Sequence, residues 1–268
     1  MRTANRRIVL GLHRSRHRRD LLSHALDLGV TALDTASNYL GHHSHCTLTM
    51  VAGDLLAKFS ISTKVGYFED GHSLLPARLR CAVEKTAKDL GCEPDTVLLH
   101  NPEHSTPNAE TLRRACAVLS DAAAAGLCGR WGISTWDPRP LVGLAIPRPE
   151  ILMVRSGLLV SSSVLDAAQA LVTGWRPTTV WGMSPFGGSA TASVWSRVDP
   201  RVFLQVPQVP AVTAVQAAFR VAFALPEVEA VAVGTDDAEH LRELLGGLAY
   251  EIDTEVVRSY RQLLSQSG

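Results

Sequence analysis

Strand-like and helix-like segments alternate along the whole chain, and this alternation constrains the fold more than any other feature. Short apolar runs are each followed by a segment with helical periodicity, as in βαβ units with a parallel sheet. The expected strands cover residues 7–12, 31–33, 61–65, 96–99, 130–133, 151–154, 179–183 and 228–233. The expected helices cover residues 15–28, 44–58, 76–90, 107–125, 140–145, 163–172, 211–224, a stretch from 238, and a final 251–266.

No connection between these segments is long enough to be a domain boundary. The longest is the Gly/Ser/Pro-rich stretch 184–210. Eight strands that are each followed by a helix, within about 250 residues, are typical of a TIM barrel. We therefore expect one (β/α)8 domain over residues 1–268, with a closed parallel sheet surrounded by helices.

Serine, proline and glycine residues indicate where several of the expected helices begin and end. Ser15 and Ser44 are expected to cap the first two helices, and Pro76 to begin the third. Gly29 and Gly91 follow helical segments and are expected to end them, because glycine readily adopts the left-handed conformation found there.

Composition excludes several classes of protein. The formal net charge is zero, which argues against a general nucleic-acid binder. No apolar run approaches the roughly 18 residues of a membrane span. The five cysteines include no C-x-x-C pair, which fits a reducing cytoplasm. The composition does not indicate an oligomeric state.

The start of the chain is rich in arginine, with seven among the first 20 residues. A transit peptide is one interpretation, and a solvated first helix is the other. We favour the helix, because residues 8–12 resemble a barrel strand and no cleavable apolar segment follows. The strong preference for arginine and alanine suggests a bacterial genome rich in GC pairs.

Polar side chains stand at the ends of three consecutive expected strands. Asp34 ends the second strand, and Tyr39 follows in a polar loop; Lys64 lies among apolar residues of the third strand, and His100 ends the fourth. Only four of the 26 basic residues are lysine, so a lysine inside a strand is unlikely to be a surface filler. In a barrel the C-terminal strand ends converge, so we expect these four side chains to meet in one site.

This pattern resembles the aldo-keto reductase family, whose Asp-Thr-Ala-x-x-Tyr loop, strand lysine and strand histidine are matched at Asp34–Tyr39, Lys64 and His100. The resemblance implies an enzyme that reduces a small aldehyde or ketone by hydride transfer. It implies that Tyr39 is the proton donor and that His100 forms a hydrogen bond to the substrate oxygen and orients it. An ammonium beside a phenol lowers the pKa of that phenol, so Lys64 is expected to lower that of Tyr39, with Asp34 holding the lysine.

The resemblance also implies a nucleotide site. NADPH is the expected cofactor, with NADH as the alternative. Ser134 matches the family serine that contacts the nicotinamide carboxamide, and the turn at Ser184, Phe186 and Gly187 matches the one that lines the pyrophosphate. Gly234, Thr235 and His240 match the final nucleotide-binding segment, at a helix N-terminus that suits phosphate.

Several positions depart from the family pattern. Met153 replaces the usual glutamine, Met183 the frequent aromatic residue, and Leu244 the usual asparagine that contacts adenine. Asp236 and Asp237 add negative charge near the expected ribose phosphate. Each lost hydrogen bond forfeits about 0.5–1.5 kcal/mol, so we expect weaker nucleotide binding than in typical relatives.

The segment His42–Cys46 contains three histidines and a cysteine, which are zinc ligands in other proteins. A structural zinc site needs four convergent ligands, and a helix starting at Ser44 disperses these. We therefore expect no bound metal, and we expect this loop to border the substrate pocket.

Two alternatives to a carbonyl reductase stay open. In one, Tyr39 and Lys64 serve proton transfer in an elimination or isomerisation without hydride chemistry. In the other, the chain is a non-catalytic binding or regulatory subunit. The four matched residues disfavour the regulatory subunit, whereas the altered cofactor positions favour both alternatives over a typical reductase.

Overall fold

Eight parallel strands close into a barrel, as predicted. The computed structural model describes residues 6–13, 15–205 and 212–266. The barrel strands are β1 (Arg7–Gly11), β2 (Ala32–Asp34), β3 (Ser60–Val65), β6 (Thr96–His100), β7 (Arg130–Thr135), β8 (Ile151–Arg155), β9 (Thr179–Met183) and β10 (Ala230–Val233). They pair in the cyclic order β1-β10-β9-β8-β7-β6-β3-β2, which confirms the α/β TIM-barrel class.

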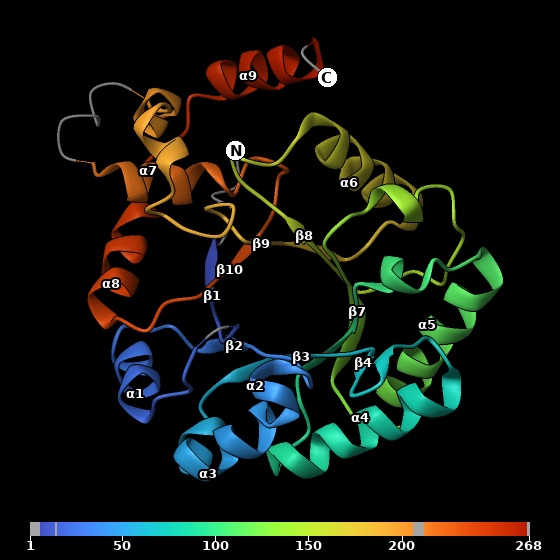
Figure 1. Cartoon of the computed structure of the whole chain (residues 1–268). Coiled ribbons are helices and arrows are strands. Elements are labelled where there is room, and N and C mark those ends of the chain that lie inside the picture. The colour runs from blue at the N-terminus through green and yellow to red at the C-terminus, as the bar shows by residue number, and fades with distance from the viewer. Residues whose placement is uncertain (1–5, 14, 206–211, 267–268) are drawn as a thin grey trace.

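Helices surround this barrel on its outer side (Figure 1). They are α1 (Arg19–Asp27), α3 (Ser44–Leu56), α4 (Pro76–Leu90), α5 (Ala109–Ala124), α6 (Ser162–Trp175), α7 (Ala214–Val221), α8 (Ala238–Gly247) and α9 (Thr254–Gln266). In the described part of the chain, short 3₁₀-helices lie in the loops: η1 (Pro102–Ser105), η2 (Arg139–Leu141), η3 (Ser193–Ser196) and η4 (Pro200–Phe203). The start of the expected helix 211–224 falls at Ala211, which lies outside the described residues.

One expected helix is wrong. Between β7 and β8, residues 140–145 do not form an α-helix, and only the short turn η2 is present. Pro138 and Pro140 flank its first residue, and Pro147 and Pro149 follow. Proline lacks an N–H and restricts the residue before it, so this composition does not sustain a longer helix.

The prediction that Ser15 and Ser44 cap helices is also wrong, whereas the prediction that Gly29 and Gly91 end helices is confirmed. Helix α1 begins only at Arg19, and the Ser15 hydroxyl accepts a hydrogen bond from the His17 N–H at 3.0 Å. Ser44 is the first residue of α3, but its hydroxyl bonds to other side chains. Gly29 and Gly91 have φ of 79° and 67°, in the left-handed region beyond their helices.

Two elements near the barrel mouth were not predicted. A small antiparallel hairpin, β4 (Tyr67–Phe68) and β5 (Gly71–His72), follows β3. A tight turn, α2 (Tyr39–His42), follows β2, with non-helical backbone inside it. Two-residue strands carry too little periodicity to be recognised from sequence.

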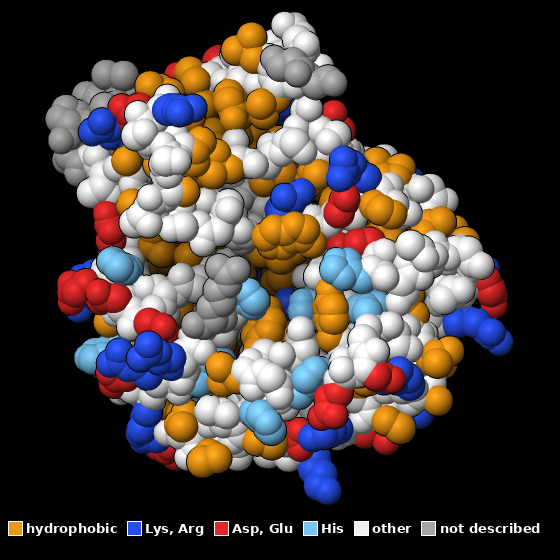
Figure 2. Space-filling model, in the orientation of Figure 1, with side chains coloured by type: hydrophobic (Ala, Val, Ile, Leu, Met, Phe, Trp, Pro, Cys, Tyr) orange, Lys and Arg blue, Asp and Glu red, His pale blue; other side chains and the backbone are white. Residues whose placement is uncertain are grey.

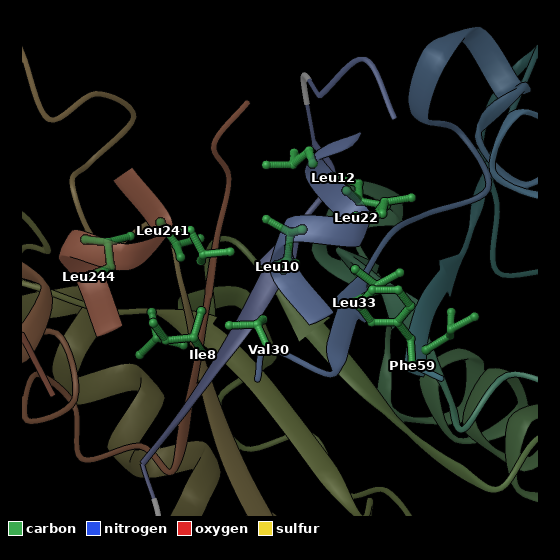
Figure 3. Close-up of a cluster of buried hydrophobic side chains, with 14 of the residues drawn as sticks. Ile8, Leu10, Leu12, Leu22, Val30, Leu33, Phe59, Leu241 and Leu244 are labelled. Carbon is green, nitrogen blue, oxygen red and sulfur yellow. The ribbon is translucent and has the colours of Figure 1, made fainter. Parts of the chain in front are cut away.

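Alternating strand residues divide the core into two parts. Outward side chains such as Leu10 and Leu33 pack beneath the helices together with Phe59 and Leu241 (Figure 3). Inward side chains such as Leu98 and Trp181 fill the barrel itself. Successive side chains of a strand point to opposite faces, so the inward positions at the C-terminal strand ends define the site.

Candidate active site

The four residues of the expected catalytic set line one cavity. Its volume is about 890 Å³, and its wall includes Asp34, Tyr39, Lys64 and His100. The cavity opens on the face seen in Figure 2, where histidine side chains gather around a central hollow. Residue register explains the convergence, because Asp34 pairs with Ser62 across β2 and β3, and Lys64 is the next inward residue on β3.

A buried ion pair holds Lys64 in place. Its Nζ lies 2.5 Å from Asp34 Oδ2 and 2.8 Å from the Thr35 carbonyl oxygen. The Ser62 hydroxyl lies 2.9 Å from the other carboxylate oxygen, Asp34 Oδ1. Burial, the largest single effect, would lower the pKa of Lys64, but the attraction of Asp34 and Tyr39 and the hydrogen bonds to them together outweigh it, and the pKa is raised. Lys64 is therefore a charged ammonium that is only 1% exposed.

Tyr39 completes this group, with its hydroxyl 3.4 Å from Lys64 Nζ. Burial raises the pKa of Tyr39, and the Lys64 ammonium counteracts only part of that effect. The effect of Lys64 thus has the expected lowering direction, but it does not bring the pKa of Tyr39 below its ordinary value. The reason is that the tyrosine is itself largely removed from water, which disfavours the phenolate. At neutral pH the hydroxyl carries its proton.

His100 faces the same space from the end of β6. Burial lowers the pKa of His100 well below its usual value, and Lys64 lowers it further, so the ring is neutral. Its Nδ1 is buried and has no hydrogen-bond partner. Because buried N–H groups are rarely left without an acceptor, the single ring proton belongs on Nε2. His100 is then a neutral hydrogen-bond donor.

The unpredicted hairpin supplies one wall of the cavity. The Tyr67 ring meets the His100 ring edge-on, with 4.9 Å between centroids. The Tyr67 hydroxyl lies 3.0 Å from His104 Nδ1 and 3.3 Å from Asn101 Nδ2. His72 donates from Nε2 to the His100 carbonyl oxygen at 2.7 Å, which ties the hairpin to β6. No motif in the sequence marks Tyr67 and His72, because only the folding of the hairpin brings them against β6.

Most residues of the expected nucleotide site line the other half of the cavity. Ser184, Phe186, Gly234, Thr235 and His240 are all in its wall. They come from the turn after β9, from the residues that follow β10 and, for His240, from the first turn of α8. Glu243, also on α8, lines the cavity as well.

Two expected cofactor residues do not line the cavity. Ser134 is fully buried, and its hydroxyl lies 3.9 Å from the Met183 sulfur. Met183 lines the cavity and replaces Ser134 there, because its long thioether reaches over the shorter side chain. Gly187 packs towards Leu159, and a Cβ at Gly187 would lie 2.8 Å from that side chain. Its neighbour Gly188 lines the cavity instead.

The departures from the family pattern have different structural contexts. Met153 is fully buried inside the barrel with Leu98 and Trp181, so it is not in the cavity wall. Leu244 lines the cavity and also packs beside Leu241 in the outer core (Figure 3).

The two acidic residues expected near the ribose phosphate also differ from each other. Asp236 lines the cavity. Asp237 instead caps α8, where its carboxylate accepts a hydrogen bond from the Glu239 N–H at 2.8 Å.

The histidine-rich segment after Tyr39 is dispersed. His45 is buried, and its Nε2 lies 2.7 Å from Thr63 Oγ1 on the outer face of β3. Cys46 is exposed. Among the described residues, no group of three His, Cys, Asp or Glu side chains has the geometry of a metal site. The segment His42–Cys46 does not contribute to the cavity wall over the described part of the chain.

Residues 12–155, more than half of the chain, match the model of the aldo/keto reductase family. The chain belongs to this family. Its members are oxidoreductases that generally use nicotinamide cofactors on small carbonyl compounds.

Individual aldo/keto reductases are similar to part of this chain. It is 36% identical over 118 residues to aflatoxin B1 aldehyde reductase member 2 of Mus musculus. The aligned region covers 42% of this chain and 31% of the relative. The chain is 35% identical over 117 residues to the human aldo-keto reductase family 7 member A3. This alignment covers 42% of this chain and 34% of the relative. The match thus spans about a third of the length of these relatives.

Solved aldo/keto reductases share the fold over nearly the whole chain. The thermostable enzyme Tm1743 superposes with a TM-score of 0.70 at 22% identity, over 97% of this chain and 94% of its own. The holo form of an aldo-keto reductase from Bacillus halodurans superposes with a TM-score of 0.68 at 18% identity. This superposition covers 92% of this chain and 86% of that one. Likeness at this identity establishes the architecture. Within the described residues, no helix combines the length and apolar character that crossing a bilayer requires.

Proposed function

We propose that this aldo/keto reductase reduces a small aldehyde or ketone with a nicotinamide dinucleotide, and that Tyr39 gives the proton to the carbonyl oxygen. The observation that carries the proposal is the buried Lys64 ammonium, which contacts both the Asp34 carboxylate and the Tyr39 hydroxyl at the wall of one cavity.

The proton moves from the Tyr39 hydroxyl to the oxygen of the carbonyl group. As the carbonyl is reduced, negative charge develops on that oxygen, and a neighbouring acid stabilises it. Loss of the proton leaves a phenolate on Tyr39. Lys64, 3.4 Å away, stabilises this phenolate, and Asp34 keeps Lys64 charged and oriented.

His100 orients the substrate. A neutral imidazole with its proton on Nε2 donates a hydrogen bond to the carbonyl oxygen without competing as a proton source. Its low pKa preserves that state at neutral pH. The ring contact with Tyr67 restrains its rotation.

The far half of the cavity suits a dinucleotide. When bound there, the nicotinamide cofactor supplies the hydride equivalent. The hydroxyls of Ser184, Ser189, Thr191 and Thr235 line this half and can donate to phosphate oxygens. Gly188 and Gly234 leave the wall there without side chains.

The family resemblance favours NADPH, but the wall around its expected ribose phosphate is partly acidic. Asp236 and Glu243 both line this part of the cavity and oppose a 2′-phosphate. We therefore expect NADPH to bind, with a smaller advantage over NADH than a basic site would give.

One observation favours the redox-independent alternative. Ser134, the expected carboxamide contact, is buried beneath Met183 and does not reach the cavity. Tyr39 and Lys64 would then serve proton transfer in an elimination or isomerisation.

Two experiments distinguish the carbonyl reductase from the redox-independent alternative. The first is fluorescence titration with NADPH and NADH, and the second is a turnover assay on a panel of small aldehydes and ketones. Micromolar binding and consumption of the reduced nucleotide support the reductase. Failure of both nucleotides to bind at millimolar concentration contradicts it and favours the redox-independent alternative.

A further inference from the structure

We propose that Thr35, Ser44 and His17 form a clamp that positions Tyr39 against Lys64. The three residues are called the neck clamp below, and residues 35–44 the tyrosine loop. They are positioning residues, since none of them lies beside the reacting atoms. Only the effect of the neck clamp on turnover rests on the proposed function; its effect on the position of Tyr39 does not.

The neck clamp closes the base of the tyrosine loop. Thr35 Oγ1 lies 2.6 Å from Ser44 Oγ, and Ser44 Oγ lies 2.6 Å from His17 Nε2. All three residues are fully buried. The loop therefore leaves and returns at one hydrogen-bonded point, with Tyr39 near its middle. His17 ties that point to the segment after β1.

The backbone beyond Tyr39 needs such a restraint. Leu40, Gly41 and His42 have φ of 50°, 60° and 68°, three consecutive residues in the left-handed region. For residues other than glycine this conformation is disfavoured, because the Cβ atom comes too close to the following carbonyl oxygen. The Leu40 side chain is 40% exposed, so its own packing offsets little of that cost. Contacts elsewhere must hold the turn, and the neck clamp lies at both of its ends.

The neck clamp is also joined to the catalytic lysine. The Thr35 carbonyl oxygen accepts a hydrogen bond from Lys64 Nζ at 2.8 Å, and the Thr35 N–H donates to the Ser62 carbonyl oxygen at 2.9 Å. The Ser37 N–H donates to the Lys64 carbonyl oxygen at 3.0 Å. The residue that anchors the loop thus also ligates the ammonium that Tyr39 must reach.

In the neck clamp, His17 is the donor of the hydrogen bond to Ser44. His17 Nδ1 is buried without a partner, so the ring proton belongs on Nε2. Burial lowers the pKa of His17, which keeps the ring neutral. His17 then donates to Ser44, and either hydroxyl can donate in the bond between Ser44 and Thr35. Replacing Ser44 removes both bonds at once.

Paired variants test the neck clamp. Thr35→Val keeps the shape of the side chain and removes its hydroxyl, and Ser44→Ala removes the central hydroxyl. Thr35→Ser restores the hydroxyl and serves as the rescue. Thr63→Val is the matched control, since it breaks a buried threonine–histidine bond of 2.7 Å, to His45, outside the tyrosine loop.

The readout is Tyr39 itself, in the full chain without nucleotide. Labelling the ζ-carbons gives one NMR signal for each of four tyrosines, and Tyr39→Phe assigns one of them. Asp34, Lys64 and Tyr67 affect the titration of Tyr39, and the His13 and His100 rings also face it. In Thr35→Val and Ser44→Ala we expect the Tyr39 signal to move towards that of free tyrosine, with its pKa falling towards the ordinary value. Thr35→Ser and Thr63→Val should keep the wild-type signal.

Turnover gives a second, separate measurement. A displaced Tyr39 should lower kcat by on the order of tenfold to a hundredfold while nucleotide affinity stays the same. A wild-type Tyr39 signal in folded Thr35→Val or Ser44→Ala would overturn the neck clamp. So would an equal change in Thr63→Val, because the cause would then be a general loss of packing. If wild-type enzyme shows no turnover, the proposed function fails, and the NMR titration still decides whether the clamp positions Tyr39.

Discussion

The two halves of the cavity are built in different ways. In the half that we propose for proton transfer, called the proton-transfer half below, Asp34, Lys64 and His100 are at most 8% exposed, and the ion pair and its ligands hold one another in place. In the half that we propose for the cofactor, called the nucleotide half below, Gly234, Asp236 and His240 are exposed. The first half is organised before any ligand arrives, whereas the second gains partners from the ligand. Changes in the first should therefore alter chemistry and stability, and changes in the second only affinity.

The largest expected effect is on the chemical step. Tyr39→Phe keeps the ring in the wall and removes the acidic proton, so kcat should fall on the order of 10²–10⁴-fold. Nucleotide affinity, measured by fluorescence, should stay at the wild-type value, because the hydroxyl belongs to the other half of the cavity. Near wild-type turnover by the folded variant would assign the proton to another group.

Next in size is the cost of breaking the buried ion pair. Lys64→Met preserves length and leaves the Asp34 carboxylate buried without its partner, so the free energy of unfolding should fall by about 3–5 kcal/mol. Lys85→Met is the control, since it breaks the exposed pair with Asp89 on α4 and should cost under about 1 kcal/mol. Denaturant unfolding of both variants measures the difference. Equal losses would show that burial does not distinguish the two pairs.

Behind the proton-transfer half, buried histidine should make stability depend on pH. Burial lowers the pKa of His45 to about 4, whereas histidine in an unfolded chain titrates near 6.5. Between these values the unfolded chain binds a proton that the folded chain does not. The free energy of unfolding should therefore fall as pH drops through this window, by on the order of 3 kcal/mol from His45.

His45→Gln removes this titration and keeps a hydrogen-bonding partner for Thr63. Its unfolding free energy should depend less steeply on pH over the same window, while the remaining buried histidines keep some slope. Denaturant unfolding at several pH values gives both curves. An unchanged slope would mean that His45 titrates alike in the folded and unfolded chain.

The smallest expected effect lies in the nucleotide half. Asp236→Asn removes one negative charge from the cavity wall and should strengthen NADPH binding roughly twofold to fivefold at low salt, with NADH unchanged. Glu84→Gln makes the same charge change on α4, away from the cavity, and should leave both affinities alone. Equal gains for NADPH and NADH would place Asp236 away from the 2′-phosphate.

Local patterns in the sequence predicted the barrel and the position of its charged residues well. Strand and helix periods differ, and their alternation indicates parallel strands. A charged residue at an apolar strand end, as with Asp34, stands out because burying it without a partner is costly. Serine was a poorer guide, since Ser15 and Ser44 resemble helix caps and make other hydrogen bonds in the fold.

What the sequence determined by itself was the alternation of elements, the inward positions of Asp34, Lys64 and His100, and the loop that carries Tyr39. Only the tertiary structure decided the pKa direction of Tyr39, the covering of Ser134 by Met183, and the wall formed by Tyr67. The physical reason is the separation along the sequence of the residues involved. Strand and helix periodicity is written in neighbouring residues, whereas desolvation and side-chain contact depend on segments that are distant in sequence and meet only when the barrel closes.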